Sequence, residues 1–183
     1  MTMQALSGCA DRDLWPAERL DSKTAVNVTI MAEPWVYSRD VPMLAANARD
    51  YLNLGVVETN RAGNRAYWLG VISWSTIDRS ILPQVARASR PARVRLLWPH
   101  ARLELPPASN GRSAIGLTEP VFEGPQASVA EAWCPLSAAQ LAQLGKGAPV
   151  AVALVDDAGE STTYGEWQVH AAALAEFLKA TGF

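Results

Sequence analysis

The stretch Tyr51-Leu-Asn-Leu-Gly-Val-Val-Glu-Thr59, followed by Arg65-Ala-Tyr-Trp-Leu-Gly-Val-Ile-Ser-Trp74, decides the fold. Both segments are rich in β-branched and aromatic residues, and the turn sequence Arg61-Ala-Gly-Asn64 stands between them. This pattern predicts a β-hairpin. The pairing is the same whether the turn has two residues or four, and it places Tyr51 opposite Trp74.

The same register makes Gly55 and Gly70 neighbours across the hairpin, which leaves the backbone bare on one face. A large ring such as Trp68 or Trp74 covers such a gap, or the sheet bends there. Alternatively, a ligand approaches the bare backbone. Both interpretations stay open, so Gly55 and Gly70 are candidate ligand-binding residues.

Short strands separated by Gly and Pro turns are expected along the rest of the chain. The alternating pattern of residues 24–37 predicts one strand kinked at Pro34, or two short strands. Further strands are predicted at residues 93–98, 101–105, 120–123, 128–133, 150–155 and 161–168. The predicted fold is mainly β, an antiparallel β-sandwich or strongly curved sheet, with an α+β fold as the alternative.

Two helices complete the predicted fold. Ser137 and Gln140 have the spacing of a capping box, and Gly145 is suited to a left-handed C-cap, so a short helix is expected at about 137–144. A C-terminal helix at about 169–180 presents Leu174, Phe177 and Leu178 on one face.

Composition restricts the class of protein. The 183 residues are 49% hydrophobic, which is typical of a globular domain with a substantial core. The 16 basic and 18 acidic side chains leave a net charge of −2, so no overall cationic surface is available for a phosphate backbone, and nucleic acid is not an expected partner. Two cysteines cannot build a disulfide framework.

The segment Leu6-Ser7-Gly8-Cys9 resembles the lipobox of bacterial lipoproteins. The resemblance implies that Cys9 is acylated and that the signal peptide is truncated here, because the eight preceding residues contain no basic region and no long apolar region. It also implies a periplasmic protein anchored to a membrane, with the outer membrane slightly favoured since Ala10 is not Asp. Residues 1–23 are then a lipobox remnant and tether, and residues 24–183 a single globular β-rich domain.

No common catalytic or cofactor motif occurs in the chain. His100 and His170 stand alone, without the ligand spacing of a zinc site, and the glycine-rich signatures of hydrolases, dinucleotide-binding and phosphate-binding proteins are missing. We therefore predict no catalytic residue, no metal and no cofactor. A hydrolase with a dispersed site remains a weaker alternative.

Two groups of residues are candidates for recognition. The polar run at 73–79 leaves the end of a strand and carries Trp74, Asp78 and Arg79. Arg93 and Arg95 are expected on one face of a strand, within a basic group that also holds Arg87, Arg90 and Arg102. This group is either a solvated face or an anion site for a lipid head group, a glycan or an acidic protein patch.

These observations predict a non-catalytic envelope lipoprotein that acts as a scaffold or protein-binding module for an envelope protein partner. A small-ligand or anionic glycan- or lipid-binding periplasmic protein, with a pocket near Gly55 and Gly70, is the alternative. A well-packed domain with a flat aromatic patch favours the first function, and a deep pocket lined by Trp and Arg favours the second. A Ser or Asp within hydrogen-bond reach of either His favours a hydrolase.

Overall fold

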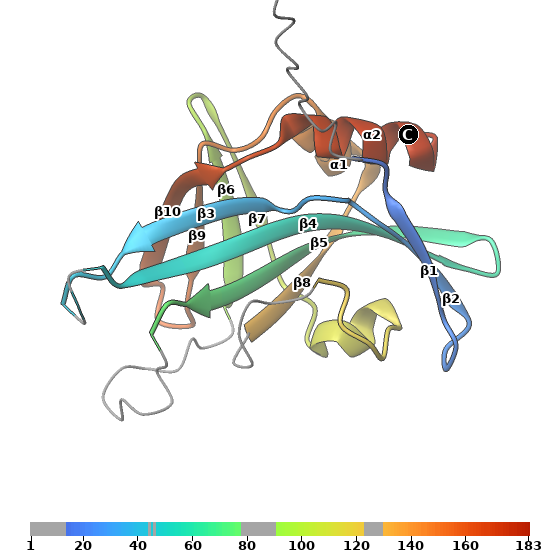
Figure 1. Cartoon of the computed structure of the whole chain (residues 1–183), viewed down its shortest axis with the longest axis horizontal. Coiled ribbons are helices and arrows are strands. Elements are labelled where there is room, and N and C mark those ends of the chain that lie inside the picture. The colour runs from blue at the N-terminus through green and yellow to red at the C-terminus, as the bar shows by residue number, and fades with distance from the viewer. Residues whose placement is uncertain (1–13, 44, 46, 78–90, 123–129) are drawn as a thin grey trace, which may run out of the picture.

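The computed structural model describes residues 14–43, 45, 47–77, 91–122 and 130–183. Its ten strands form one antiparallel sheet, and two helices lie together at one end of it (Figure 1). The strands are β1 (Ala17–Asp21), β2 (Val26–Ile30), β3 (Trp35–Asp40), β4 (Arg49–Arg61), β5 (Asn64–Ser75), β6 (Arg93–Trp98), β7 (Ala101–Leu105), β8 (Ala130–Leu136), β9 (Ala151–Val155) and β10 (Ser161–Gln168). The helices are α1 (Ala138–Gly145), α2 (Ala171–Thr181) and the short 3-10 helix η2 (Gly111–Ile115).

The long strand β4 organises the sheet. Along one edge, β4 pairs with β3 through its first half and with β2 through its second half. Along its other edge it pairs with β5 from Asp50 to Arg61, and β5 in turn pairs with β8. From β3 the sheet continues through β10, β9 and β6 to β7, whereas β2 leads only to β1. The predicted mainly β fold is confirmed.

The sheet is strongly curved, so that it encloses its own core. Figure 1 shows β6, β7 and β9 behind β3, β4 and β5, with α1 and α2 across one open end. The chain that follows β7 comes beside β8, because the Ala108 N–H donates a hydrogen bond to the Trp133 carbonyl at 2.7 Å. Of the two predicted β architectures, the strongly curved single sheet is the observed one.

The hairpin of β4 and β5 has the predicted register. Tyr51 lies opposite Trp74 and Gly55 lies opposite Gly70. The turn consists of Ala62 and Gly63, whose φ angles of 50° and 89° are both positive. Positive φ at both central residues is the geometry that matches the twist of a two-residue hairpin, and glycine adopts it without strain.

Buried side chains form two clusters on opposite faces of the sheet, as alternation along a strand requires. Val56 belongs to the inner cluster, which fills the space between the sheet and the helices, whereas the next residue, Val57, belongs to the outer cluster. The outer cluster lies under the segment that contains Ile115 and Leu117. The largest fully buried side chains of the inner cluster are Trp35, Tyr37, Phe177, Met31, Leu52, Leu54, Leu69, Leu96, Leu105, Leu141 and Leu144.

The predicted capping box of α1 is confirmed. The Ser137 side chain accepts a hydrogen bond from the Gln140 backbone N–H at 3.3 Å, and the Gln140 side chain accepts one from the Ser137 N–H at 2.8 Å. The prediction that Gly145 is a left-handed C-cap is wrong, since Gly145 is the last residue of the helix and Lys146 is the C-cap. A Cβ atom on Gly145 would lie 2.9 Å from Leu178 Cδ1, so this glycine lets α2 approach α1.

Of the two alternatives for residues 24–37, the structure has two short strands, β2 and β3. Other predicted segment boundaries change. Residues 17–21, expected within a tether, form β1 and pair with β2, so the folded unit starts before residue 24. Residues 120–122 are not a strand, the rest of that prediction lies outside the described residues, and the following strand extends through 130–136. The sequence of residues 17–21 alone does not predict a strand, because these residues form β1 by pairing with β2.

Candidate functional site

The most distinctive feature of the outer face is a pair of stacked aromatic rings on the β4–β5 hairpin. The ring centroids of Tyr51 and Trp74 are 4.2 Å apart and their planes differ by 9°. The Trp74 Nε1–H donates a hydrogen bond to Asn53 Oδ1 at 3.0 Å, so the indole is held at both its face and its polar edge. Rings in this arrangement lose little conformational freedom when a partner binds.

A third ring reaches the pair from β10. The ring of Trp167 meets that of Tyr51 edge to face, with centroids 6.0 Å apart and an interplanar angle of 83°. Glu166 and Gln168 pair with consecutive residues of β3, which makes Trp167 the extra residue of a β-bulge. The Trp167 side chain is 52% exposed and is therefore the most accessible ring of the three.

One arginine completes the group. The guanidinium of Arg49 lies 4.4 Å from the centroid of the Trp167 ring, and its Nε–H donates a hydrogen bond to Asp40 Oδ1 at 2.6 Å. The hydrogen bond to Asp40 is the main cause that raises the pKa of Arg49 above its usual value. We call the group formed by Arg49, Tyr51, Asn53, Trp74 and Trp167 the aromatic cluster.

The aromatic cluster has the composition of a protein-docking site. Tryptophan, tyrosine and arginine are the residues that contribute most to binding energy at protein interfaces. Each ring offers a large apolar area with a polar atom at its edge, and Arg49 contributes a charge that is partly exposed. None of its five residues forms a nucleophile–base pair within the cluster.

The sequence prediction located part of this cluster. Trp74 was a candidate, and its pairing with Tyr51 follows from the hairpin register. Arg49 and Trp167 were not candidates, because only tertiary pairing through β3 brings β10 beside β4. The neighbouring candidates Asp78 and Arg79, and the lipidation candidate Cys9, lie outside the described residues.

The glycine pair lies elsewhere on the outer face and is covered by rings. A Cβ atom on Gly55 would lie 2.1 Å from Phe122 Cζ, and one on Gly70 would lie 2.7 Å from Trp133 Cζ3. The ring-covered interpretation therefore holds, although the rings come from Phe122 and Trp133 and not from Trp68 or Trp74. The space that a ligand at the bare backbone would need is filled.

The candidate arginines of β6 face outward from the core. Arg93 and Arg95 alternate with the buried Val94 and Leu96, so they share the expected strand face. Arg95 pairs with Glu104 across the β6–β7 hairpin at 2.8 Å, and this hydrogen bond is the main cause that lowers the pKa of Glu104. Glu104 thus neutralises part of the positive charge of this basic group.

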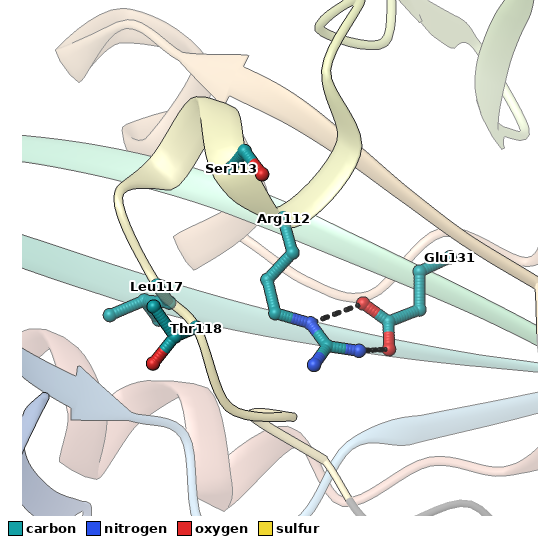
Figure 2. A pocket seen from close by; sticks show the side chains of 5 residues that line it. All are labelled: Arg112, Ser113, Leu117, Thr118 and Glu131. Carbon is teal, nitrogen blue, oxygen red and sulfur yellow. Dashed lines mark hydrogen bonds and ion pairs between the residues drawn. The ribbon is translucent and has the colours of Figure 1, made fainter. Parts of the chain in front are cut away.

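An open hollow of about 590 Å³ lies beside η2, and Figure 2 shows its lining residues. Arg112 and Glu131 form a bidentate ion pair across it, with one contact of 3.0 Å from Arg112 Nε to Glu131 Oε2. Glu131 also accepts a hydrogen bond from the Trp133 indole at 3.2 Å. The two charges neutralise each other, and the ion pair links η2 to β8.

The described contacts of the His170 ring are with an amide and a carboxylate. His170 Nε2 lies 3.0 Å from Gln168 Nε2 and 3.4 Å from Glu33 Oε2. Within the described ranges, no group of three or more His, Cys, Asp or Glu residues is placed to hold a metal ion.

Comparisons of the chain with protein-family models, with curated proteins and with solved structures found no match. In the described part of the chain, neither α1 nor α2 is long and apolar enough to cross a membrane.

Proposed function

We propose that this chain is a non-catalytic binding module of the bacterial envelope, which a lipid on Cys9 anchors to a membrane. In this proposal the aromatic cluster docks an envelope protein. The observation that carries the docking function is the exposed Trp167 ring, positioned by Tyr51 and Arg49 on the outer face. The lipobox resemblance of residues 6–9 supports the anchor.

The packing of the domain supports a surface function over an enclosed pocket. The space inside the curved sheet is filled by one cluster of buried side chains contributed by strands and by both helices. Rings also cover Gly55 and Gly70, where the alternative ligand pocket was expected. An exposed aromatic cluster on a filled domain is an arrangement that favours partner binding.

The anchor is tested by acyl labelling. The full reading frame, including any sequence upstream of Met1, is expressed in a bacterial host as wild type and as Cys9→Ala. We expect labelled, membrane-bound wild type and an unlabelled variant. Soluble, unlabelled wild-type protein would remove the anchor from the proposal.

Docking is tested by site-specific photo-crosslinking. A photoreactive amino acid is placed at Ser38, which lies opposite Tyr51 on β3, and crosslinks to envelope proteins are compared between variants. Trp167→Ala should abolish a discrete adduct, and the affinity for the isolated partner should fall about 30-fold, as expected for a hot-spot residue. Val150→Ala is the control, since Val150 is an apolar residue of similar exposure, 48%, that belongs to neither the aromatic cluster nor the N-terminal segment. An adduct that survives Trp167→Ala would refute docking at the aromatic cluster.

A further inference from the structure

We infer that the C-terminal half of α2 and the chain entering β1 rest on the surface of a phospholipid bilayer. The contact surface consists of Trp15, Leu20, Lys179 and Phe183, which we call the α2 patch. The inference rests on the proposed anchor at Cys9 and adds the orientation that the anchored domain adopts.

The length of the chain before the folded unit limits how far this patch lies from the anchor. Leu14 packs against the inner core, and only residues 10–13 separate it from Cys9. Five residue steps span at most about 18 Å even when fully extended. An acylated Cys9 therefore keeps the surface around Leu14 close to the bilayer.

The residues at this surface have the chemistry of a membrane interface. Trp15, Leu20 and Phe183 are 54%, 59% and 45% exposed, so three large apolar side chains meet solvent at this surface. The ammonium group of Lys179 lies 5.9 Å from the centroid of the Trp15 ring. Tryptophan at the head-group level and lysine with an apolar stem are typical anchors at the boundary between lipid and water.

The four residues lie around the same end of α2. Phe183 directly follows the helix, and its N–H donates a hydrogen bond to the Leu178 carbonyl at 3.0 Å. Leu20 of β1 lies opposite Asn27, which lines a hollow of about 270 Å³ together with Ala180 and Thr181 of α2. The apolar side chains therefore belong to one end of the domain.

The α2 patch and the aromatic cluster are at opposite ends of β4. Asn60 lines the same hollow as Ala180 and Thr181, whereas Tyr51 lies near the other end of the strand. Nine residue steps along a strand correspond to about 30 Å. Asn60 and Tyr51 also face opposite sides of the sheet, because they are an odd number of residues apart on β4. A partner can therefore reach the aromatic cluster while the α2 patch touches lipid.

The test uses chemical coupling in place of cellular acylation. The purified chain is attached through the Cys9 thiol to a maleimide lipid in vesicles of phosphatidylethanolamine and phosphatidylglycerol. Cys134 is buried, and Cys9→Ala controls for its coupling. Bromine atoms on the acyl chains quench tryptophans that reach the bilayer, so fluorescence is compared between brominated and unbrominated vesicles.

The matched pair is Trp15→Phe and Trp167→Phe, because these two tryptophans are almost equally exposed. We expect Trp15→Phe to lose most of the bromine-dependent quenching and Trp167→Phe to retain it. Equal quenching in wild type and Trp15→Phe, or a loss that follows Trp167→Phe, would overturn the orientation. Failure of acyl labelling at Cys9 in cells is a separate result, which would refute the anchor without altering the quenching measured here.

Discussion

The Trp133 ring lies directly on Gly70, where a Cβ atom would be only 2.7 Å from Trp133 Cζ3. Trp133 is the cross-strand neighbour of Gly70, and its side chain is 1% exposed. The absence of a side chain at residue 70 is therefore what lets the outer cluster close over the β5–β8 pair. Gly55, opposite Gly70, is covered by Phe122 in the same way.

Replacement of Gly70 by alanine should destabilise the protein by about 1–3 kcal/mol, because the added methyl group displaces a tightly packed ring. The midpoint of urea unfolding measures this loss. Gly165→Ala is the control, since Gly165 is also in a strand and nothing lies within 4 Å of a Cβ atom there. Equal stability of the Gly70→Ala variant and the wild type would contradict the close packing.

Low pH should destabilise the folded protein by protonating the Asp21 carboxylate. This buried carboxylate accepts hydrogen bonds from the Thr118 N–H at 2.7 Å and hydroxyl at 2.9 Å, and from the N–H groups of Thr24 and Lys23. The Thr118 N–H is the main cause that holds the pKa of Asp21 well below its usual range. Because the folded-state pKa is lowered, the stabilisation is present above the unfolded pKa of about 3.9 and is lost as the pH falls below it.

The measurement is the difference in unfolding midpoint between wild type and Asp21→Asn as a function of pH. We expect a clear difference at pH 7 that shrinks as the pH falls below that of the free carboxyl group. A difference that stays constant over this range would show that the ionised form of Asp21 is not the stabilising one.

The pair formed by Glu58 and Arg65 should respond unequally to removal of either partner. Arg65 Nε and Nη2 donate to the two Glu58 oxygens at 2.8 Å each, and Nη2 also donates to the Thr181 carbonyl at 2.7 Å. The Glu58 side chain is 5% exposed, whereas that of Arg65 is 46% exposed. Loss of the arginine leaves a buried carboxylate without its charged partner, but loss of the carboxylate leaves an arginine that water reaches.

We therefore expect Arg65→Met to destabilise the fold by about 3 kcal/mol and Glu58→Gln by roughly 1 kcal/mol. Chemical denaturation of both variants tests this order. The reverse order would mean that Arg65, and not Glu58, carries the larger burial cost.

The capping box of α1 offers a local test. Ser137→Ala removes the acceptor for the Gln140 N–H and should cost about 1 kcal/mol of stability. Ala139→Ser, an exposed change within the same helix, should stay within about 0.5 kcal/mol of wild type. Thermal or chemical unfolding of the two variants distinguishes the cap from a general effect of hydroxyl groups in this helix.

The sequence by itself determined the features that depend on neighbours along the chain. The β4–β5 register follows from a two-residue turn, because the turn pairs Arg61 with Asn64 and every later pair is then set. The capping box follows from the spacing of Ser137 and Gln140. Both features arise from backbone geometry over a few residues, which alternation and side-chain type reveal directly.

Only the tertiary structure decided which distant side chains meet. The Trp167 ring joins Tyr51 because β10 and β4 both pair with β3, and a bulge in β10 leaves Trp167 without a strand partner. Phe122 and Trp133 cover the glycines, and β1 joins the sheet through β2. The energies that select these contacts come from burial of apolar area shared by several strands, a property of the assembled sheet that no single segment carries.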